Sequence, residues 1–424
     1  MRYTNLNLKT LDYFQFKDKL VLLRIDINSP SVKGKILDNP RFEQSGSTIK
    51  EILSKNAKLV IIAHQGRKGK SDFLSLKQHA QILSKHLGRK IRYIPDLLGK
   101  KASLAINSLQ NKEAILLENV RFYNEDADNS SFYKFSRLFD LFVNDSFSVS
   151  HRNQASIVIP PKVIPSCVGR AFEKEINSLK RLNLSGKKGS YLIGGAKIED
   201  YLPLFNLLKN KNSKILASGV LANLILVSKG INLGYENKWL KKNKYTRLTP
   251  KLKEIYKKYK FQIILPIDFA LGSLDKKEKR REISIKKAPF NEKILDIGHN
   301  SVDLFKKEIR NSNLIFMKGP LGFSEIQEYS YATREILSFI SRMSEKGAFS
   351  ILGGGHLSST IQKYKIPDNF SYISSSGGAL IAFISGERLP GIEALESGVS
   401  QGQKNLWNQL QGNIAANISV LFQL

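Results

Sequence analysis

Short runs of apolar residues alternate along this chain with longer segments whose apolar positions recur at helical spacing. In Leu20–Ile27 (LVLLRIDI) and Lys58–Ala63 (KLVIIA), apolar residues stand at odd and even positions alike, which is typical of a parallel strand buried on both faces. Gln44–Lys55 and Leu76–Leu87 carry the spacing of crossover helices. This alternation predicts an α/β fold built on doubly wound parallel sheets.

Polar and cationic residues follow each predicted strand of this first part of the chain. Two further strands, Ala114–Glu118 and one within Leu138–Asn144, end in the same way. Open α/β sheets bind ligands outside the carboxyl ends of their strands, and guanidinium groups match phosphate and carboxylate bidentately. A single arginine there is usually a surface residue, but we expect several at equivalent strand ends to converge on a small polyanion. The residues concerned are Asn28, Arg41, His64, Arg67, Arg121 and Arg152, with Asp26 at the polar end of the first strand.

Three prolines between positions 160 and 165 separate this part from a polar helix predicted over Phe172–Leu182, where we place the connection between domains. A chain of 424 residues exceeds the size at which one hydrophobic core stops growing, so two domains are expected. Beyond the helix the pattern resumes and predicts a second set of strands. They are expected at Ser190–Ile193, Lys214–Leu216, Gln262–Pro266, Lys293–Ile297, Leu314–Met317, Phe349–Leu352 and Ser371–Ser374.

Glycine-rich turns follow four of these later strands. Gly194-Gly195, closely followed by Lys197, leads from a strand into a predicted helix. Such a turn alone is usually only a tight turn, although glycine admits a ligand close to the backbone and a helix start offers free N–H groups to phosphate. With Gly319–Gly322, Gly353–His356 and Ser374–Gly378, it predicts a nucleotide site. The P-loop pattern and the G-x-G-x-x-G spacing are both missing from the sequence, which disfavours P-loop NTPases and dinucleotide-binding dehydrogenases.

Charge and cysteine content narrow the choice of function. The 67 Lys+Arg residues against 37 Asp+Glu give a net charge of +30, enough to suggest nucleic-acid binding. The excess is spread evenly along the chain, and its densest runs, Lys238–Arg247 and Lys276–Arg281, are typical of solvated faces. We therefore expect no nucleic-acid partner. Cys167 is the one cysteine and is expected to be buried, which excludes an internal disulfide and a multi-cysteine metal site.

The sequence predicts neither a membrane span nor a signal peptide, because its apolar runs are short and its first residues lack an apolar core. We expect a cytoplasmic protein that acts as a monomer, with a dimer as the alternative. The tail, Glu396–Leu424, ends in the apolar segment ANISVLFQL. We expect it to form an extra packed helix, with a partner-binding segment as the alternative.

Nine segments, spread in order over roughly residues 20–395, resemble the motifs of the phosphoglycerate kinase family. One such match arises easily by chance, whereas nine in the same order do not. The segments are RIDINSP (Arg24–Pro30), AHQGR (Ala63–Arg67), LLENVRF (Leu116–Phe122), FVNDSFSVSHRNQAS (Phe142–Ser156), GGAKIED (Gly194–Asp200), KGPLGFSE (Lys318–Glu325), LGGGH (Leu352–His356), ISSSGGA (Ile373–Ala379) and LPGIEAL (Leu389–Leu395).

This resemblance implies two doubly wound α/β domains joined by a helix, residues 1–165 with about 396–424 binding phosphoglycerate and 166–395 binding nucleotide. It implies reversible phosphoryl transfer between ATP, carried with Mg²⁺, and the carboxylate of 3-phosphoglycerate, with domain closure around both substrates. Arg41 and Lys197 would be catalytic. Residues holding 3-phosphoglycerate would be Asp26, Asn28, Arg41, His64, Arg67, Arg121 and Arg152. Residues holding the nucleotide would be Gly194, Gly195, Lys197, Gly219, Lys318, Gly319, Pro320, Glu325 (at the ribose), Gly353, Gly354, Gly355 and His356.

Three positions depart from the pattern of the better-known bacterial and eukaryotic members. Tyr201 stands where they carry a second lysine, and His356 where they carry an aspartate that helps hold the magnesium nucleotide. Lys318 stands where they carry an asparagine. Neutral imidazole is a poor ligand for Mg²⁺, so the sequence assigns no metal ligand. The first two replacements resemble the archaeal branch of the family, and we expect Lys318 to offset the cation missing at Tyr201.

Two other functions stay open at this point. A non-catalytic relative could use the same fold and its basic surface to bind nucleic acid, but the presence of Arg41, Lys197 and the full arginine set favours the enzyme. A kinase for another small carboxylate is the second alternative, and arginines suited to a phosphate group favour 3-phosphoglycerate over it.

Overall fold

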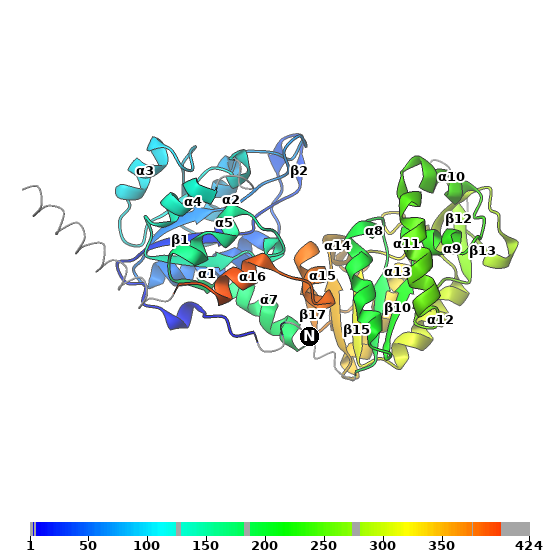
Figure 1. Ribbon diagram of the computed structural model, residues 1–424. Coiled ribbons are helices and arrows are strands. Elements are labelled where there is room, and N and C mark those ends of the chain that lie inside the picture. The colour runs from blue at the N-terminus through cyan, green and yellow to red at the C-terminus, as the bar shows by residue number, and fades with distance from the viewer. Residues whose placement is uncertain are drawn as a thin grey trace, which may run out of the picture. The chain divides into compact units, whose positions relative to one another are not determined.

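Contacts between residues divide the computed structural model into two compact units, drawn in Figure 1. The N-terminal unit comprises Asn5–Asn177 and Arg388–Leu424, and the C-terminal unit comprises Met1–Thr4 and Ser178–Glu387. The boundary near residue 177 falls inside helix α7 (Arg170–Lys180). The structure describes residues 3, 6–123, 129–181, 187–273, 280–374 and 376–399. Most of the predicted tail and of the basic run Lys276–Arg281 therefore lies outside the described residues.

The N-terminal unit is built on a parallel sheet of six strands in the order β5-β6-β4-β1-β7-β8. In the central strand β1, Leu22 pairs with Val60 of β4 on one side and with Phe142 of β7 on the other. The first strands lie on the β4 side, where β6 inserts between β4 and the edge strand β5, and the later strands β7 and β8 lie on the other side of β1. The order therefore reverses between β1 and β7. The strands are β1 (Leu20–Ile25), β4 (Lys58–Ile62), β5 (Arg92–Tyr93), β6 (Ala114–Leu116), β7 (Leu141–Asp145) and β8 (Ser166–Val168).

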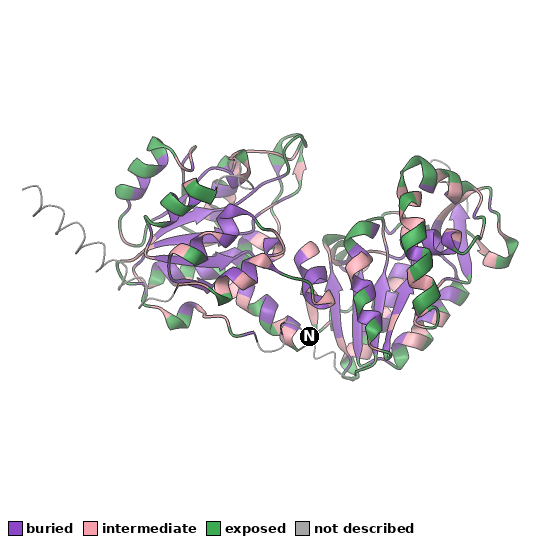
Figure 2. Ribbon diagram, viewed as in Figure 1, coloured by how far each residue is buried: buried purple, intermediate pink, exposed green. Residues whose placement is uncertain are grey.

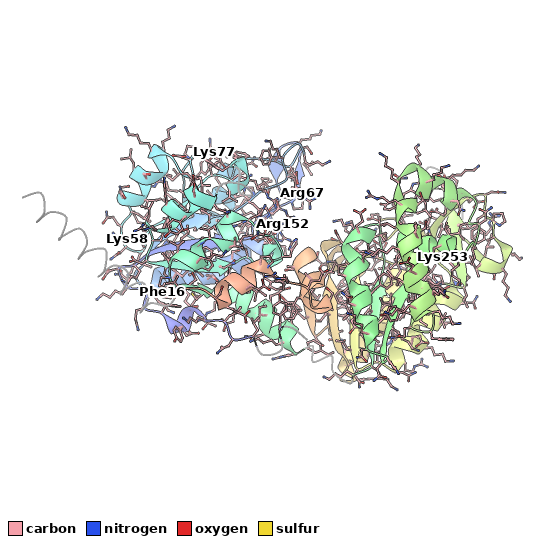
Figure 3. The ribbon with its side chains drawn as sticks, viewed as in Figure 1. Phe16, Lys58, Arg67, Lys77, Arg152 and Lys253 are labelled. Atoms are coloured by element: carbon pink, nitrogen blue, oxygen red, sulfur yellow. The ribbon has the colours of Figure 1, made fainter. Side chains whose placement is uncertain are left out.

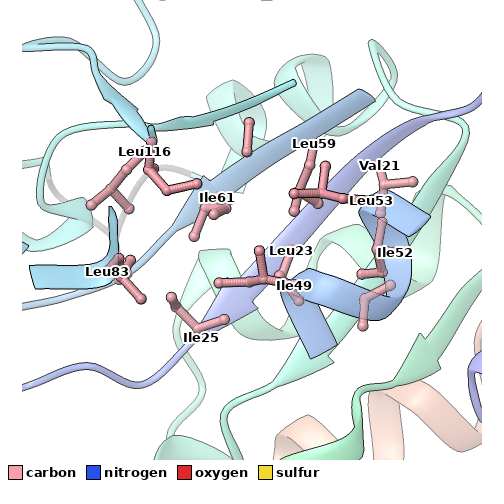
Figure 4. Close-up of a cluster of buried hydrophobic side chains, with 14 of the residues drawn as sticks. Val21, Leu23, Ile25, Ile49, Ile52, Leu53, Leu59, Ile61, Leu83 and Leu116 are labelled. Atoms are coloured by element: carbon pink, nitrogen blue, oxygen red, sulfur yellow. The ribbon is translucent and has the colours of Figure 1, made fainter. Parts of the chain in front are cut away.

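Helices cover both faces of this sheet, because alternate residues of each strand point to opposite sides. Val21, Leu23 and Ile25 pack with residues of α1 and α2, as Figure 4 shows, whereas Leu22 packs with residues of α3 and α4. This explains why both parities of β1 are apolar. The helices of this unit are α1 (Pro40–Ser54), α2 (Lys77–Leu87), α3 (Lys100–Asn107), α4 (Asn129–Ser136), α5 (Ala155–Val158), α6 (Pro160–Val163) and α16 (Pro390–Glu396), beside a small hairpin of β2 (Ser31–Val32) and β3 (Lys35–Ile36).

Helix α1 begins earlier than the sequence pattern predicts. Asn39 caps it by accepting a hydrogen bond from the backbone N–H of Arg41 at 3.0 Å, and Pro40 occupies the first helical position. Proline is pre-organised for that position, and asparagine is a preferred cap. The first turn therefore includes Arg41 and holds its backbone at the edge of the sheet.

The C-terminal unit repeats this architecture with a parallel sheet in the order β11-β10-β9-β15-β16-β17. Its strand order reverses between β9 and β15, where Leu192 pairs with Met317. The strands are β9 (Gly189–Ile193), β10 (Ser213–Ala217), β11 (Ile263–Ile264), β15 (Leu314–Lys318), β16 (Phe349–Gly353) and β17 (Tyr372–Ser374). The helices are α8 (Ile198–Tyr201), α9 (Gly219–Ser228), α10 (Tyr235–Lys242), α11 (Thr249–Tyr259), α12 (His299–Arg310), α13 (Tyr331–Glu345), α14 (Gly355–Lys363) and α15 (Gly378–Ser385).

One predicted strand of this half lies outside the parallel sheet. Lys293–Ile297 forms β14, but it pairs antiparallel with β12 (Asp268–Gly272) in a separate three-stranded sheet completed by β13 (Arg281–Ser284). The apolar pattern predicted this strand correctly but placed it with the strands of the parallel sheet, which is wrong. The second half of β14 is buried like those strands, and burial does not reveal which strand pairs with which.

The predicted fold class is confirmed by these two doubly wound sheets. In each unit the central strands of the parallel sheet are buried and many exposed residues lie on the outer surfaces of the helices, as Figure 2 shows. Cys167 is buried and free, as expected. Within the described residues, the structure contains no helix with the length and apolar character that a membrane span requires.

Candidate functional site

Asp26 and Arg41 form the centre of a polar cluster at the carboxyl end of β1. Nη1 of Arg41 lies 2.8 Å from Oδ2 of Asp26, and the Ser148 hydroxyl donates to the same oxygen. The backbone N–H of Asn28 donates to Oδ1 of Asp26 at 3.0 Å. Burial alone would raise the pKa of Asp26, but the Arg41 charge and these hydrogen bonds hold it well below its usual value. Asp26 is therefore a fixed anion that orients Arg41.

His64 is buried beside a fully buried arginine. Nη2 of Arg24 lies 3.1 Å from Nδ1 of His64, and the guanidinium group can only donate. Burial, followed by the charges of Arg24, Arg121 and Arg41, lowers the pKa of His64 well below its usual value, against the opposing pull of Asp26. The imidazole is therefore neutral, with its proton on Nε2, and three arginines lie close enough to act on it.

The loop after β4 connects these groups to Arg121. Oδ1 of Asn28 accepts a hydrogen bond from the Gly66 N–H at 2.8 Å, and Nη1 of Arg121 donates to the Gly66 carbonyl. Asn119 caps the 3₁₀ helix that carries Arg121 by accepting from its N–H at 3.1 Å. Asp26, Asn28, Arg41, His64 and Arg121 therefore belong to one contiguous cluster, which we call the arginine cluster.

Two predicted residues, Arg67 and Arg152, lie at the same edge of the sheet. Arg67 is exposed on the loop that follows β4, and Arg152 is half-buried on the segment that follows β7. Figure 3 labels both side chains. Because β4 and β7 flank β1 in parallel, both arginines follow strands whose carboxyl ends lie at the same edge as that of β1.

In the C-terminal unit, glycine turns meet backbone to backbone where the strand order reverses. A Cβ on Gly194 would lie 2.0 Å from the Pro320 carbonyl oxygen, and one on Gly319 would lie 2.5 Å from the Gly194 oxygen. A Cβ on Gly219 would lie 2.9 Å from the Gly195 nitrogen. Gly319 and Gly219 also have positive φ angles of 76° and 56°. Only glycine fits these positions, so the turns after β9, β10 and β15 form one surface lined by backbone.

Lys318, the last residue of β15, lies beneath two further turns. Its side chain is buried, and Nζ donates to the Ser376 carbonyl at 3.3 Å. A Cβ on Gly353 would lie 3.2 Å from this Nζ, and one on Gly354 would lie 3.4 Å from it. One ammonium group is therefore shared by the turns that follow β15, β16 and β17.

The segment around Lys197 differs from its prediction. Lys197 is exposed and caps a helix, α8, of only four residues, which continues as a 3₁₀ helix with Pro203 near its start. The helix predicted after Lys197 is therefore present, but so short a helix provides little dipole to an anion at its start. The longer helices α9 and α14 begin instead at Gly219 and Gly355. At this turn the positive charge therefore comes from the Lys197 side chain and not from a helix dipole of α8.

Tyr201 and His356 occupy different environments. Tyr201 is buried, and burial, with a smaller effect of Asp200, raises its pKa to about 12, so its hydroxyl is neutral at physiological pH. His356 is exposed, and its Nδ1 lies 3.3 Å from Oε1 of Glu325. Among the residues that the structure describes, no three His, Cys, Asp or Glu side chains gather closely enough to hold a metal ion.

Sequence reasoning missed some supporting residues. Ser148, on the segment after β7, donates its hydroxyl hydrogen bond to Asp26 at the end of β1. Asn39 accepts a hydrogen bond from the backbone N–H of Arg41. A hydroxyl inside a longer polar segment gives no specific signal in a single sequence. Asn39 could have been found, because asparagine directly before proline is a helix-start pattern.

Comparison with known proteins gives a consistent result. The family model described as phosphoglycerate kinase matches residues 11–387. The chain is 37% identical over 417 residues to a phosphoglycerate kinase of Methanosarcina mazei, covering 95% of this chain and 98% of that protein. It is 40% identical over 402 residues to one of Archaeoglobus fulgidus, covering 92% and 96%. The crystal structure of the Pyrococcus horikoshii phosphoglycerate kinase has a TM-score of 0.82 at 33% identity and covers 91% of this chain and 98% of its own.

Proposed function

This chain belongs to the phosphoglycerate kinase family, and we propose that its two sheet-end sites divide the reaction between them. The enzyme transfers a phosphoryl group reversibly between ATP and the carboxylate of 3-phosphoglycerate, giving 1,3-bisphosphoglycerate and ADP. In our proposal the arginine cluster takes 3-phosphoglycerate and the glycine turns take the nucleotide. The motif resemblance to archaeal members is matched by the archaeal relatives.

The proposed phosphoglycerate site is supported by charge. The ligand carries a phosphate and a carboxylate, and guanidinium groups bind both with paired hydrogen bonds. Neutral His64 adds a donor at Nε2, because Arg24 occupies Nδ1. Asp26 keeps Arg41 in one orientation by their 2.8 Å ion pair. The proposed ligand-binding residues are Asp26, Asn28, Arg41, His64, Arg67, Arg121 and Arg152.

The proposed nucleotide site is supported by shape. Backbone N–H groups in glycine turns can approach phosphates closely, and an open α/β sheet binds ligands where its strand order reverses. The contact of Gly194 with Pro320 at that point is the observation that carries this assignment. We place Glu325 at the ribose. The proposed residues are Gly194, Gly195, Lys197, Gly219, Lys318, Gly319, Pro320, Glu325, Gly353, Gly354, Gly355 and His356.

The transfer step needs charge and position rather than a base. The attacking carboxylate is already ionised at neutral pH, so no proton has to be removed. As the phosphoryl group passes from one oxygen to the other, negative charge spreads over its equatorial oxygens, and fixed cations stabilise it. We propose that Arg41 and Lys197 are these catalytic cations.

Magnesium is best regarded as part of the nucleotide substrate. Mg²⁺ prefers oxygen ligands and keeps several waters, and the described residues offer no acidic cluster for it. We propose that ATP phosphates and water hold the ion, and that His356 does not coordinate it. Because Tyr201 is neutral, we further propose that Lys318 supplies the second cation of the nucleotide site.

A coupled assay of 1,3-bisphosphoglycerate formation tests the catalytic assignment. Lys197→Ala and Arg41→Ala are each expected to lower kcat by about 10²- to 10³-fold, as for other pre-organised charge-stabilising groups. Arg41→Lys keeps a positive charge beside Asp26 but removes the guanidinium group. It therefore tests whether the charge alone supports catalysis. Lys242→Ala and Arg89→Ala remove exposed cations elsewhere and serve as matched controls. Wild-type rates in Lys197→Ala and Arg41→Ala would contradict the assignment.

The protein's state in solution completes the proposal. We propose that it works as a monomer, because each proposed ligand site is formed within a single copy of the chain, and we retain the cytoplasm as its proposed location. Light scattering at assay concentration measures its mass directly. A dimer whose dissociation abolishes activity would contradict this.

A further inference from the structure

Consecutive residues of the turn before Lys197 are each held by one hydrogen bond from a different element. The Gly194 N–H donates to the Lys318 carbonyl at 2.9 Å, and the Gly195 carbonyl accepts from the Val220 N–H at 3.2 Å. The Ala196 carbonyl accepts from the Tyr245 hydroxyl at 3.1 Å. The last anchor before Lys197 is therefore a side chain 49 residues away.

This last anchor matters because the turn becomes exposed where it reaches Lys197. Gly194 is buried and Gly195 half-buried, whereas Ala196 and Lys197 are both exposed. Helix α8, which Lys197 caps, has four residues and no side-chain cap. Burial resumes only at Ile198, so the solvent-exposed hydrogen bond from Tyr245 is the contact that holds the Ala196 carbonyl directly.

Tyr245 itself packs against a stack of aromatic rings and a lysine. Its ring stacks on Trp239 with centroids 5.6 Å apart and an angle of 22° between planes. Nζ of Lys293 lies 5.1 Å from the Trp239 ring and 6.0 Å from the ring of Phe323. Stacked rings lose little conformational freedom, and a cation over a ring face is attracted to it.

This stack joins two turns of the proposed nucleotide site. Phe323 directly follows the turn Gly319–Gly322, and Tyr245 reaches the turn that ends in Lys197. The ion pair of Arg247 with Glu199 also links the segment of Tyr245 to helix α8, which follows Lys197. Both of its side chains are exposed, so we expect it to contribute little.

We propose that Tyr245 is a positioning residue for phosphoryl transfer, which holds the Ala196 carbonyl and thereby the backbone that presents Lys197. This inference rests on the proposed catalytic role of Lys197. Tyr245 does not touch the reacting atoms. It acts by limiting the movement of the turn, so its loss should affect the step in which Lys197 meets the transferred group more than the binding of 3-phosphoglycerate.

Tyr245→Phe removes the hydroxyl and keeps the stacked ring, so folding should be preserved. One neutral hydrogen bond is worth a factor of about twofold to tenfold, and we expect kcat to fall by that amount. The KM for 3-phosphoglycerate should stay unchanged, and the thermal midpoint should fall by a few degrees at most. Tyr259→Phe, on a half-buried tyrosine of α11, is the matched control and should leave kcat as it is.

A double-mutant cycle with Lys197→Ala distinguishes positioning from a direct contact with the nucleotide. If Tyr245 acts through Lys197, Tyr245→Phe should change kcat by less than about 1.5-fold once Lys197 is alanine. An equal fall in both backgrounds would overturn the inference, and so would wild-type kcat in Tyr245→Phe. The proposed function would survive either result if Lys197→Ala alone is severely impaired. Wild-type kcat in Lys197→Ala would instead refute the role of Lys197, and this inference with it.

Discussion

The two units share a doubly wound parallel architecture, and in our proposal they bind their ligands by different means. In the N-terminal unit the site consists of charged side chains that hold one another, as the pair of Asp26 and Arg41 does. In the C-terminal unit it consists of backbone, since Gly194 and Gly319 leave no room for a Cβ. Both sites lie where a doubly wound sheet reverses its strand order. The fold therefore fixes the place of a site, and the residues at the strand ends fix its chemistry.

This difference predicts different sensitivities to substitution. A site of side chains should be sensitive to loss of charge and tolerant of small changes in volume. A site of backbone should be sensitive to added volume, because a methyl group displaces the turns themselves. Lys318 and Lys197 are exceptions in the second unit, where single cations complete a surface that is otherwise backbone.

Gly194→Ala should have the largest effect. Its methyl group would lie 2.0 Å from the Pro320 carbonyl oxygen, so the turns after β9 and β15 must separate. A displacement of about 1 Å at a reacting centre can cost about 10²-fold in rate, and we expect at least that loss in kcat/KM for ATP. Overpacking should also lower stability by about 1–3 kcal/mol.

Gly46→Ala is the matched control for this prediction in the other unit. A methyl group there would lie 3.6 Å from Leu87, an ordinary contact. Because Gly46 lies inside helix α1, alanine should keep or raise stability by up to about 1 kcal/mol. Equal loss of thermal midpoint in both variants would show that added volume is no more harmful at the glycine turns than elsewhere.

Lys318→Asn should have an intermediate effect. It removes the cation shared by the turns after β15, β16 and β17 and replaces it with a shorter, neutral side chain. We expect kcat/KM for ATP to fall by about tenfold, in keeping with the loss of one hydrogen bond to a charged group. The KM for 3-phosphoglycerate should not change. An unchanged kcat/KM for ATP would show that Lys318 does not replace the cation missing at Tyr201.

The parts of the fold that sequence predicted are those with an unambiguous burial pattern. Strands β1 and β15 are buried on both faces and apolar at both parities, so they were recognisable as central parallel strands. β14 shows a similar pattern, yet it belongs to the antiparallel sheet. Apolar pattern reports burial, and pairing depends on contacts between segments far apart in the chain.

The candidate site was predictable where its chemistry depends on residue type and order. Lys197 was identified because it follows a predicted strand within a recognisable motif. Arg41 lies outside the nine motifs, between the first predicted strand and the first predicted helix, and its role was implied by the family resemblance. Tyr245 was not identified, because it stands in a basic run that looks like an ordinary solvated face. Its importance comes from a hydrogen bond to Ala196 that only the folded chain creates.

Asp145→Asn should have the smallest effect on catalysis, because it changes stability and not the proposed sites. Burial raises the pKa of Asp145 to about 7 in the folded N-terminal unit, from 3.8, against the hydrogen bonds from Thr48 and the Phe172 N–H. The folded state therefore holds a proton that the unfolded state loses between these values. Stability from this group is present below pH 4 and is lost as pH rises to about 7, with a slope of up to about 1.4 kcal/mol per pH unit.

Thermal midpoints of wild type and Asp145→Asn at several pH values measure this effect. Asparagine cannot ionise, so the thermal midpoint of the variant should rise relative to that of the wild type between pH 4 and 7. At pH 8 the variant should be the more stable protein. A midpoint difference independent of pH would rule out the shifted carboxyl group.

Calorimetric titration of each substrate into Arg67→Ala and Lys197→Ala tests the division between the units most directly. Both residues are exposed cations after a strand, one in each unit, so both variants should fold normally. Arg67→Ala should raise the Kd for 3-phosphoglycerate by about tenfold or more and change the Kd for Mg-ATP by less than about twofold. Lys197→Ala should raise the Kd for Mg-ATP and leave the Kd for 3-phosphoglycerate unchanged. The reverse pattern, or equal weakening of both ligands in both variants, would contradict the account.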